Sequence, residues 1–490
     1  MKKIISLLSV LALSAGAFAQ TQDTTATVTG DDHKVKMLEN EQMEDYRRSS
    51  LYSVLVKHSN ANYGQTIDSV FMIMETPDKF NNHDLAVKSF ESSSAKAKKV
   101  KEKVRGTDKD PNVIDIAAFV EANGVAREMV AKWFDRDPQT GYFDVDLIKE
   151  RGYYDASWQS IEEADASVRG RAMLADAGFD LIGKTFMIVN DITFVDHGEN
   201  SAKAGAGIKA GLSLLGTIGT LVTGDDSFTG LGESTGELIG SIANEIAGYK
   251  VNIISYLYRL DWNEELLDQF LTEYWIDASN PDPAKKAAFE ASDLFSLSYV
   301  GYTMTSAENV SSKTFSQKPL QEQFLKVCTR ALDKAIVELQ REYDEFKIKV
   351  PIYAMNEDGT VSVKIGLKEG VTENSTYEVL MKDMSSGVAE YVRVGMLKPV
   401  AGKIWDNRFG ALEEAQMLEA DRKAAEEEAA ESGAGTADGN AAVAEAAAAE
   451  AAETAELEEG NPYMDATVFE ITSGANKIYP GLLIREVRIK

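Results

Sequence analysis

Histidine and cysteine are the residues of this chain best suited to metal or nucleophilic chemistry, and there are few of them. The four histidines are His33, His58, His83 and His197, and the single cysteine is Cys328. No two histidines have the spacing of a paired zinc ligand such as HExxH. We therefore predict no catalytic, cofactor-binding or metal site, and we expect a non-enzymatic protein.

An exported, metal-dependent hydrolase is the alternative that these residues leave open. His58 follows a β-prone run at residues 51–56, and His83 precedes another at residues 85–90. If both runs are strands of one sheet, the two imidazoles approach each other, with the carboxylate of Asp84 beside His83. This arrangement would supply the acid–base groups that hydrolysis needs.

Glycine has the most regular spacing in the chain, in a segment that covers residues 201–249. In the second half it recurs every four residues, which places the glycines on one helix face and lets another backbone approach closely. We predict a helical hairpin with a glycine-zipper seam that mediates self-association or membrane contact. A mobile Gly-rich insertion is the alternative. The seam consists of Gly207, Gly211, Gly232, Gly236, Gly240 and Gly248.

Acidic residues exceed basic ones by a wide margin, 79 against 51, which gives a formal net charge of −28. Nearly half of the excess lies in residues 411–460, where fifteen Asp and Glu accompany two Lys and Arg. Such a chain repels phosphate backbones, so we expect no nucleic-acid partner. This segment is rich in Ala and Glu, which favour helix, and is predicted to be an exposed helical insert.

The N-terminal sequence is typical of a Sec signal peptide at residues 1–19. Two lysines precede a short apolar run, and Ala17-Phe18-Ala19 offers a small-x-small cleavage site. We expect export to the periplasm, to the outer membrane or to the medium. Residues 20–42 are rich in Thr and Asp without an apolar period, and are predicted to be a flexible leader.

Alternation of strands and helices predicts an α/β domain over residues 43–349. The clearest strands are residues 185–195 and 250–260, because both are long and rich in β-branched and aromatic residues. Weaker patterns predict further strands at residues 143–148, 269–276 and 294–303.

Two helices are predicted more sharply than the others in this domain. Asn112 is the expected cap of one helix, which breaks near Asn123-Gly124. The other covers residues 320–346 and carries Cys328 on its apolar stripe. The thiol is therefore predicted to lie in the core rather than to react.

Residues 350–490 differ in kind and predict a small all-β, barrel-like domain. Asp358-Gly359 is a hairpin signal, and the strand pattern resumes at residue 467, after the acidic insert of residues 411–460. The last strands of this domain are therefore expected to follow the insert.

Short phrases in both domains carry a resemblance to known families. Residues 177–186 read AGFDLIGKTF, and this helix-to-strand phrase resembles one in the periplasmic α/β domain of the curli secretion channel and related envelope assembly lipoproteins. In the β-rich part, Gly366, Gly370 and the run Tyr377-Glu378-Val379 resemble the small C-terminal domain of flagellar assembly T-type proteins. The resemblance implies an accessory or assembly protein in an oligomeric envelope complex. The chain departs from the channel family by lacking a lipid-modified cysteine at its signal peptide.

Together these features predict a non-enzymatic, exported cell-envelope protein, an accessory or assembly component that self-associates or contacts the outer membrane. Its partners are expected to be copies of itself or other envelope proteins. Besides the hydrolase, a surface adhesin or glycan-binding protein is an alternative, for which Tyr153, Tyr154 and Trp158 would supply aromatic contacts.

Overall fold

The computed structural model contains two β-sheets, and the parts of the chain built on them are called the first and the second domain below. The described residues are 49–59, 61, 64–93, 102–148, 179, 181–196, 249–308, 320–383, 390–417, 419–420, 423 and 460–487. The predicted signal peptide, leader, glycine-rich seam and most of the acidic insert lie outside them.

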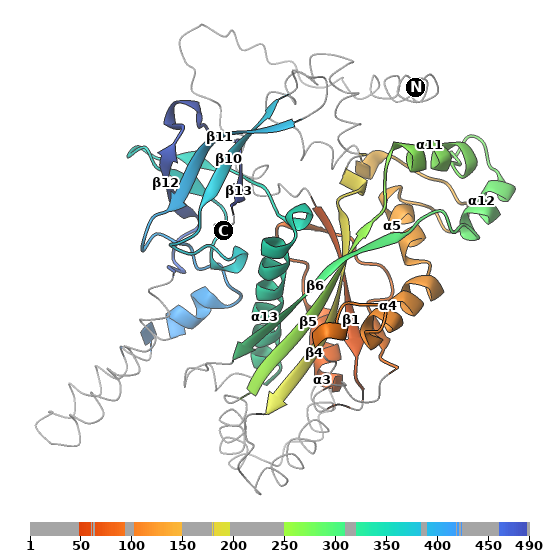
Figure 1. Ribbon diagram of the computed structural model, residues 1–490, viewed down its shortest axis with the longest axis horizontal. Coiled ribbons are helices and arrows are strands. Elements are labelled where there is room, and N and C mark those ends of the chain that lie inside the picture. The colour runs from red at the N-terminus through yellow and green to blue at the C-terminus, as the bar shows by residue number, and fades with distance from the viewer. Residues whose placement is uncertain are drawn as a thin grey trace, which may run out of the picture.

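The first domain is built on a sheet of mixed strands (Figure 1). Its strand order is β2-β1-β4-β5-β6, and β3 also pairs with β1. β1 runs parallel to β2, β3 and β4, whereas β5 runs antiparallel to its two neighbours, β4 and β6. The strands are β1 (Ser49–Lys57), β2 (Phe80–Asn82), β3 (Ser89–Glu91), β4 (Thr185–Asp196), β5 (Tyr249–Leu260) and β6 (Leu297–Glu308).

Helices cover both faces of this sheet, since its central strands are apolar on both sides. The side chains of β1 alternate: Leu51 and Leu55 face α3 and α13, whereas Tyr52, Val54 and Val56 face α4 and α5. Figure 1 shows α13 and the α4–α5 pair on opposite sides of the strands. The helices are α3 (Gly64–Ile73), α4 (Pro111–Ala122), α5 (Val125–Trp133), α11 (Glu264–Glu273), α12 (Pro283–Glu290) and α13 (Leu320–Glu342).

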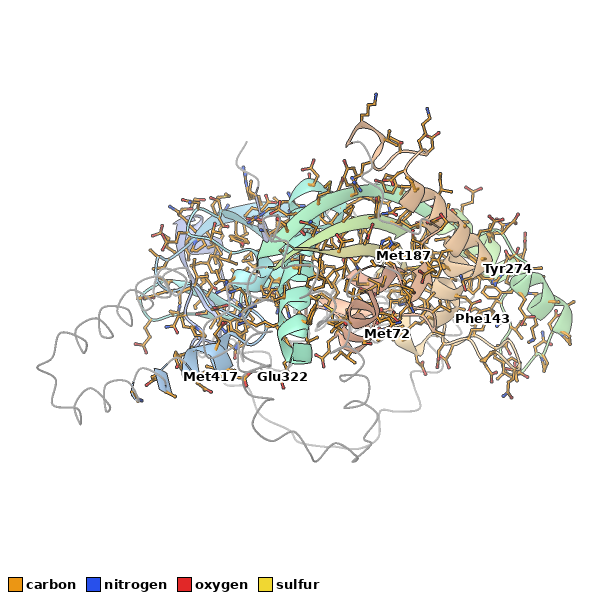
Figure 2. The ribbon with its side chains drawn as sticks, turned by 90° about the horizontal axis from the view of Figure 1, so that it is seen from below. Met72, Phe143, Met187, Tyr274, Glu322 and Met417 are labelled. Atoms are coloured by element: carbon orange, nitrogen blue, oxygen red, sulfur yellow. The ribbon has the colours of Figure 1, made fainter. Side chains whose placement is uncertain are left out.

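Side-chain exposure follows these layers (Figure 2). Met187 of β4 is fully buried inside the first domain, whereas Met72 lies at the surface of α3 and is about half exposed. The helices therefore shield this sheet, and the exposed large apolar side chains of this part lie on α3, on α4, on the edge strand β6 and in the loop before β3.

The second domain is a curled antiparallel sheet that forms an open half-barrel. Its strand order is β7-β13-β10-β11-β12-β9-β8. β12 and β13 follow the acidic insert in sequence, as predicted, and the structure places both in the interior of the sheet. The strands are β7 (Val350–Pro351), β8 (Ala354–Met355), β9 (Val361–Val363), β10 (Tyr377–Asp383), β11 (Glu390–Pro399), β12 (Thr467–Ser473) and β13 (Leu483–Glu486).

α13 joins the two domains, since it packs on the first sheet and also contacts the second domain. Lys326 and Arg330 of α13 form ion pairs with Glu414, which follows β11, at 2.5 Å and 3.0 Å. At the C-terminal end of α13, Arg341 donates to the carbonyl of Gly370 at 2.8 Å. Gly370 has a positive φ of 77°, and an added Cβ would lie 2.5 Å from Val337 of α13. Only glycine therefore permits this close approach.

Several predicted elements are confirmed. The long strands at residues 185–195 and 250–260 are β4 and β5, and the long helix is α13. Cys328 is buried on that helix, and burial raises the pKa of its thiol to about 12. The hairpin signal at Gly359 lies between β8 and β9, where the glycine has a φ of 83°.

Other predicted strands are wrong. Most of residues 269–276 belong to α11, because Asn263 caps that helix and the apolar side chains of Leu267 and Phe270 recur at helical spacing on its buried face. Residues 143–145 are irregular, and 146–148 are helical. Of residues 85–90, only the last two belong to a strand, β3.

No helix within the described residues is long and apolar enough to cross a bilayer.

Candidate functional site

A buried ion pair lies at the carboxyl ends of the parallel strands. His58 comes directly after β1, and Asp191 of β4 is next to Val56 in the strand register. The Nε2 atom of His58 lies 2.8 Å from Oδ1 of Asp191, and each side chain is only 7% exposed. The pair joins the two parallel strands at the level where β1 ends, while β4 continues to Asp196.

The N-terminus of α4 supplies the second partner of Asp191. Asp110 caps this helix by accepting from the backbone N–H of Asn112 at 3.1 Å, and Pro111 stands at the first helical position. Asn112, the predicted cap, is therefore the second residue of the helix, two residues after the actual cap. Its side chain instead donates to Oδ2 of Asp191 at 2.8 Å. Pro111 explains the shift, because proline fits the first position of a helix and the residue before it takes the cap.

Tyr256 of β5 closes the network. Its hydroxyl donates to Oδ2 of Asp110 at 2.9 Å and accepts from the side chain of Asn112 at 3.3 Å. Burial, followed by the charge of Asp110, raises the pKa of the Tyr256 phenol well above its usual value, so it stays a neutral donor. A continuous chain of hydrogen bonds thus runs from His58 through Asp191, Asn112 and Tyr256 to Asp110.

Electrostatics favour the protonated form of His58. The hydrogen bond to Asp191 is the largest effect and raises the pKa of the imidazole, burial opposes it, and the charges of Glu91 and Asp115 add to the rise. The other ring nitrogen, Nδ1, is buried and has no hydrogen-bond partner among the described residues. The ring therefore has one nitrogen fixed by Asp191 and one left to meet another group.

Acidic side chains line the outer side of this site. Both carboxylate oxygens of Glu91 accept from Ser59, one from its backbone N–H at 3.0 Å and the other from its hydroxyl at 2.6 Å. The Ser59 hydroxyl bond is the main reason why the pKa of Glu91 is lowered. Asp115 accepts from the backbone N–H of Ser93 at 2.9 Å. These carboxylates favour positively charged or proton-donating ligands.

The location is one where α/β sheets bind ligands. The chain leaves β1 through α3 on one face and reaches β4 through α4 and α5 on the other face. In open α/β sheets, ligands bind at the carboxyl ends of the strands next to such a switch. The group formed by His58, Asp191, Asn112, Tyr256 and Asp110 is therefore the candidate functional site. Chemically it can hold and release a proton at His58.

The predicted approach of His58 and His83 is wrong. His83 follows β2, and its backbone N–H donates to the carbonyl of Leu51 near the start of β1. Six residues of β1 separate that level from His58, which is about 20 Å along a strand. The Nε2 atom of His83 pairs with the carbonyl of Met129 at 2.9 Å in the core. A catalytic pair of these two histidines is excluded.

Two strings in the sequence match catalytic or phosphate-binding consensus patterns. Residues 178–185 (GFDLIGKT) fit GxxxxGK[ST], but residues 181–182 are helical and β4 follows, the reverse of the strand–loop–helix order that binds phosphate. The hydroxyl of Thr185 is buried and accepts from the indole N–H of Trp133 at 2.7 Å. The first string is therefore structural. Residues 232–236 (GESTG) fit GxSxG and lie outside the described residues.

The glycines of the predicted seam, Gly207 to Gly248, also lie outside the described residues, but the points where that segment attaches are clear. Asp196 at the end of β4 and Tyr249 at the start of β5 are register partners. The segment is therefore inserted at the tip of a β-ribbon, five residues beyond Asp191. The described residues contain no group of three or more His, Cys, Asp or Glu that could hold a metal ion.

Comparison with protein-family models, with curated proteins and with solved structures finds no match. The site must therefore be judged on its chemistry. One signal in the sequence pointed to it: Asn190-Asp191 interrupts the otherwise apolar run TFMIVNDITFV of β4. A carboxylate in a buried strand needs partners, and that requirement marks the position.

Proposed function

We propose that the chain is an exported, non-enzymatic component of a bacterial cell envelope that acts by associating with copies of itself. Export is supported by the signal-peptide pattern of residues 1–19. Assembly is supported by the resemblance of residues 177–186 and 366–379 to envelope assembly proteins. The observation that carries the proposal is the edge strand β6.

β6 is long and is protected at its edge only in part. It has one bulge, at Val300, and the hydroxyl of Tyr343 accepts from the backbone N–H of Tyr302 and donates to its carbonyl. Only β5 pairs with it among the described residues. The run from Leu297 to Ala307 contains no charged residue and no proline, although the whole chain has a net charge of −28. Met304, near the middle, is 56% exposed. Natural proteins protect free edges with charges, prolines or bulges. The stretch around Met304 has neither a charge nor a proline and lies beyond the bulge, so it is the part of this edge that favours association.

A second copy of the chain is the partner that fits this edge best. Antiparallel pairing of two identical strands has two-fold symmetry, the commonest symmetry of soluble dimers. Two copies with this net charge repel each other over most of their surface. Along the uncharged residues of β6 no like charges would lie opposite each other, so the edges can pair.

The glycine-rich segment fits the same proposal. Its two ends, at Asp196 and Tyr249, lie at the end of the sheet where Glu308 of β6 pairs with Lys250. A helical hairpin with a seam at Gly236 and Gly240 would there extend the contact between copies or reach the outer membrane. The helical hairpin, the Ala/Glu helical insert and the periplasmic character of the first domain are parts of this proposal.

Light scattering of the purified protein tests the role of β6. We expect Met304→Lys to lower the mean mass toward that of one chain, because an introduced lysine opposes its symmetry mate across the edge. Val392→Lys is the matched control, since Val392 is exposed to a similar degree on β11, an interior strand of the other sheet. A monomeric wild type, or an equal effect of both variants, would contradict the proposal.

The same measurement on a variant with Gly236→Leu and Gly240→Leu tests the glycine seam separately. A changed mass with intact circular dichroism supports seam-mediated assembly, and an unchanged mass assigns the contact to β6 alone.

An exported hydrolase is the second candidate. It is favoured by the Nδ1 atom of His58, which has no hydrogen-bond partner among the described residues, on a ring whose Nε2 atom pairs with Asp191. Metal analysis of purified wild type and His58→Ala tests it. Stoichiometric zinc in the wild type, lost in the variant, would support hydrolysis, and no bound metal in either would remove this metal-dependent alternative.

A further inference from the structure

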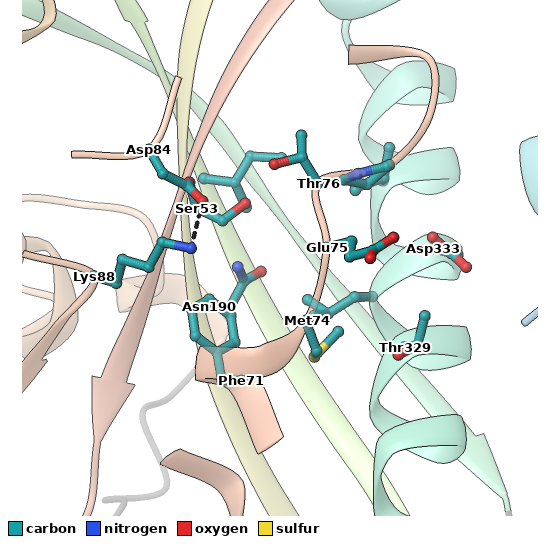
Figure 3. A pocket seen from close by; sticks show the side chains of 14 residues that line it. Ser53, Phe71, Met74, Glu75, Thr76, Asp84, Lys88, Asn190, Thr329 and Asp333 are labelled. Atoms are coloured by element: carbon teal, nitrogen blue, oxygen red, sulfur yellow. Dashed lines mark hydrogen bonds and ion pairs between the residues drawn. The ribbon is translucent and has the colours of Figure 1, made fainter. Parts of the chain in front are cut away.

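A small cavity lies on the face of the first sheet opposite to the His58 site. Its walls come from the end of α3 and the residues after it, from β1 and β4, and from α13 (Figure 3). Its volume is ≈ 40 Å³. By the usual allowance of roughly 10–15 Å³ for each water, it has room for about three waters or one small polar head group.

The cavity is acidic. Glu75, Asp84 and Asp333 line it, with Lys88 as the one cationic side chain in its wall. Lys88 forms an ion pair with Asp84 at 2.5 Å, and Asp84 also accepts from the backbone N–H of Ser53 at 3.0 Å. Figure 3 shows that pair at one end of the cavity, with Glu75 and Asp333 at the other end. At the end formed by α13, the lining therefore holds two carboxylates and no cation, and Lys368 of the second domain acts on Asp333 from outside the lining.

Asp333 is the unusual member of this set. Asp333 is only 8% exposed. Its Oδ2 atom is buried and accepts no hydrogen bond from the described residues. A buried carboxylate oxygen without a donor costs several kcal/mol of desolvation unless a proton or a cation meets it. This oxygen is an independent sign that the cavity is built to receive a donor.

We propose that this cavity binds a primary ammonium group, with Asp333 and Glu75 as its anionic partners. An ammonium head has three N–H donors, which matches the oxygens of Asp333, Glu75 and the hydroxyl of Thr329 around the α13 end. Phe71 and Met74 supply an aromatic and a thioether surface beside it, both favourable neighbours of an organic cation.

A metal ion fits less well. Calcium takes six to eight oxygen ligands, and the α13 end offers two carboxylates. The volume suits a head group with a short carbon chain, whose remainder extends through the mouth beside Glu75, which is exposed. The amine can be a free small molecule or the side chain of a lysine.

Protons compete with this ligand. Burial raises the pKa of Asp333 to about 7, with Glu369 and Asp78 raising it further and Lys368 and Arg330 opposing. Below that pH the carboxyl is protonated and loses its charge, so binding of the ammonium group weakens. The charged groups that face Asp333 are Glu75 beyond α3, Asp78 in the following loop, Arg330 of α13, and Lys368 and Glu369 of the second domain.

Titration calorimetry of the full chain with methylammonium chloride at pH 8 tests the proposal. We expect saturable binding that Asp333→Asn weakens by about 10- to 100-fold, the value of one charge-assisted hydrogen bond. Glu342→Gln is the matched control, an exposed carboxylate on the same helix, and should leave the affinity unchanged. A second signature is a loss of affinity between pH 8 and pH 5.5 that Asp333→Asn abolishes.

Two further probes decide the ligand class. Tetramethylammonium has the same charge without N–H donors, and equal binding of this ion would overturn the assignment. So would calcium binding that depends on Asp333 while methylammonium has no effect. Nα-acetyl-lysine amide binding more tightly than methylammonium assigns the source to a protein lysine, and the reverse order assigns it to a free amine; both orders support an ammonium site. The inference does not depend on the self-association of β6, since a monomeric variant would still bind.

Discussion

Asp191 and Asp333 are two buried carboxylates on opposite faces of one sheet, and they differ in their hydrogen-bond donors. Each oxygen of Asp191 accepts from a fixed donor, His58 on one side and Asn112 on the other. Oδ2 of Asp333 has no donor among the described residues. The first carboxylate is satisfied by the fold, and the second needs a proton or a ligand. The comparison shows that burial alone does not tell a structural acid from a binding one.

Removing Asp191 should give the largest effect. Asp191→Ala leaves the His58 imidazole and the Asn112 amide buried without their acceptor, so we expect a loss of about 3 to 5 kcal/mol in the free energy of unfolding. Urea denaturation followed by fluorescence measures it. Asp344→Ala removes a strongly exposed carboxylate and should change stability by less than about 0.5 kcal/mol. An unchanged midpoint in Asp191→Ala would show that the network does not stabilise the domain.

Asp333→Asn should act in the opposite direction and depend on pH. The raised pKa means that the folded wild type holds the Asp333 proton more tightly than the unfolded chain does. The stability that this proton adds to the folded state is therefore fully present below about pH 4 and is lost as the pH rises to about 7. Asparagine does not titrate. We expect its stability advantage to grow by about 2 to 3 kcal/mol between pH 5 and pH 8. Urea denaturation at the two pH values measures this, and a constant difference would contradict the ionisation argument.

The smallest expected effect concerns His58. Because its folded pKa is raised, the stability that its charged form contributes is present below pH 6.5 and is lost as the pH rises through the folded value. His58→Gln should therefore lower the free energy of unfolding by about 1 to 2 kcal/mol at pH 5.5 and by less at pH 8.5.

An NMR titration of the His58 ring supplies the matched check. Asp191→Asn should lower its pKa, since the hydrogen bond to Asp191 is the largest cause of the rise. The same midpoint in both proteins would mean that Asp191 does not control the imidazole.

Local patterns in the sequence predicted the elements that are long and apolar. β4, β5 and α13 each carry a continuous apolar signal, so their types follow from propensity and period alone. α11 was missed because its apolar residues allow both a strand and a helix, and the cap at Asn263 decides between them. The cap of α4 was misplaced by two residues, since Asp110 and Asn112 are both good caps and only Pro111 distinguishes them.

The candidate site was beyond such reasoning, because its members are far apart in the chain. His58 and Asp191 are separated by 133 residues, and Asp110 and Tyr256 by 146. They meet only because β1 lies between β2 and β4 in the sheet, an order that no local pattern specifies. Asp333 was hidden for another reason: a single acid on a long amphipathic helix is usually solvated, and here the second domain covers it.

The strand order of the second sheet has a consequence for the folding of the nascent chain. β12 lies between β11 and β9, and β13 lies between β7 and β10. β12 and β13, which follow the acidic insert, therefore provide interior strands with which β7, β9, β10 and β11 pair. Until they emerge, the half-barrel has unpaired strands in its middle. Pairings of such long sequence separation form slowly, so we expect the closure of this sheet by β12 and β13 to be a slow step in folding.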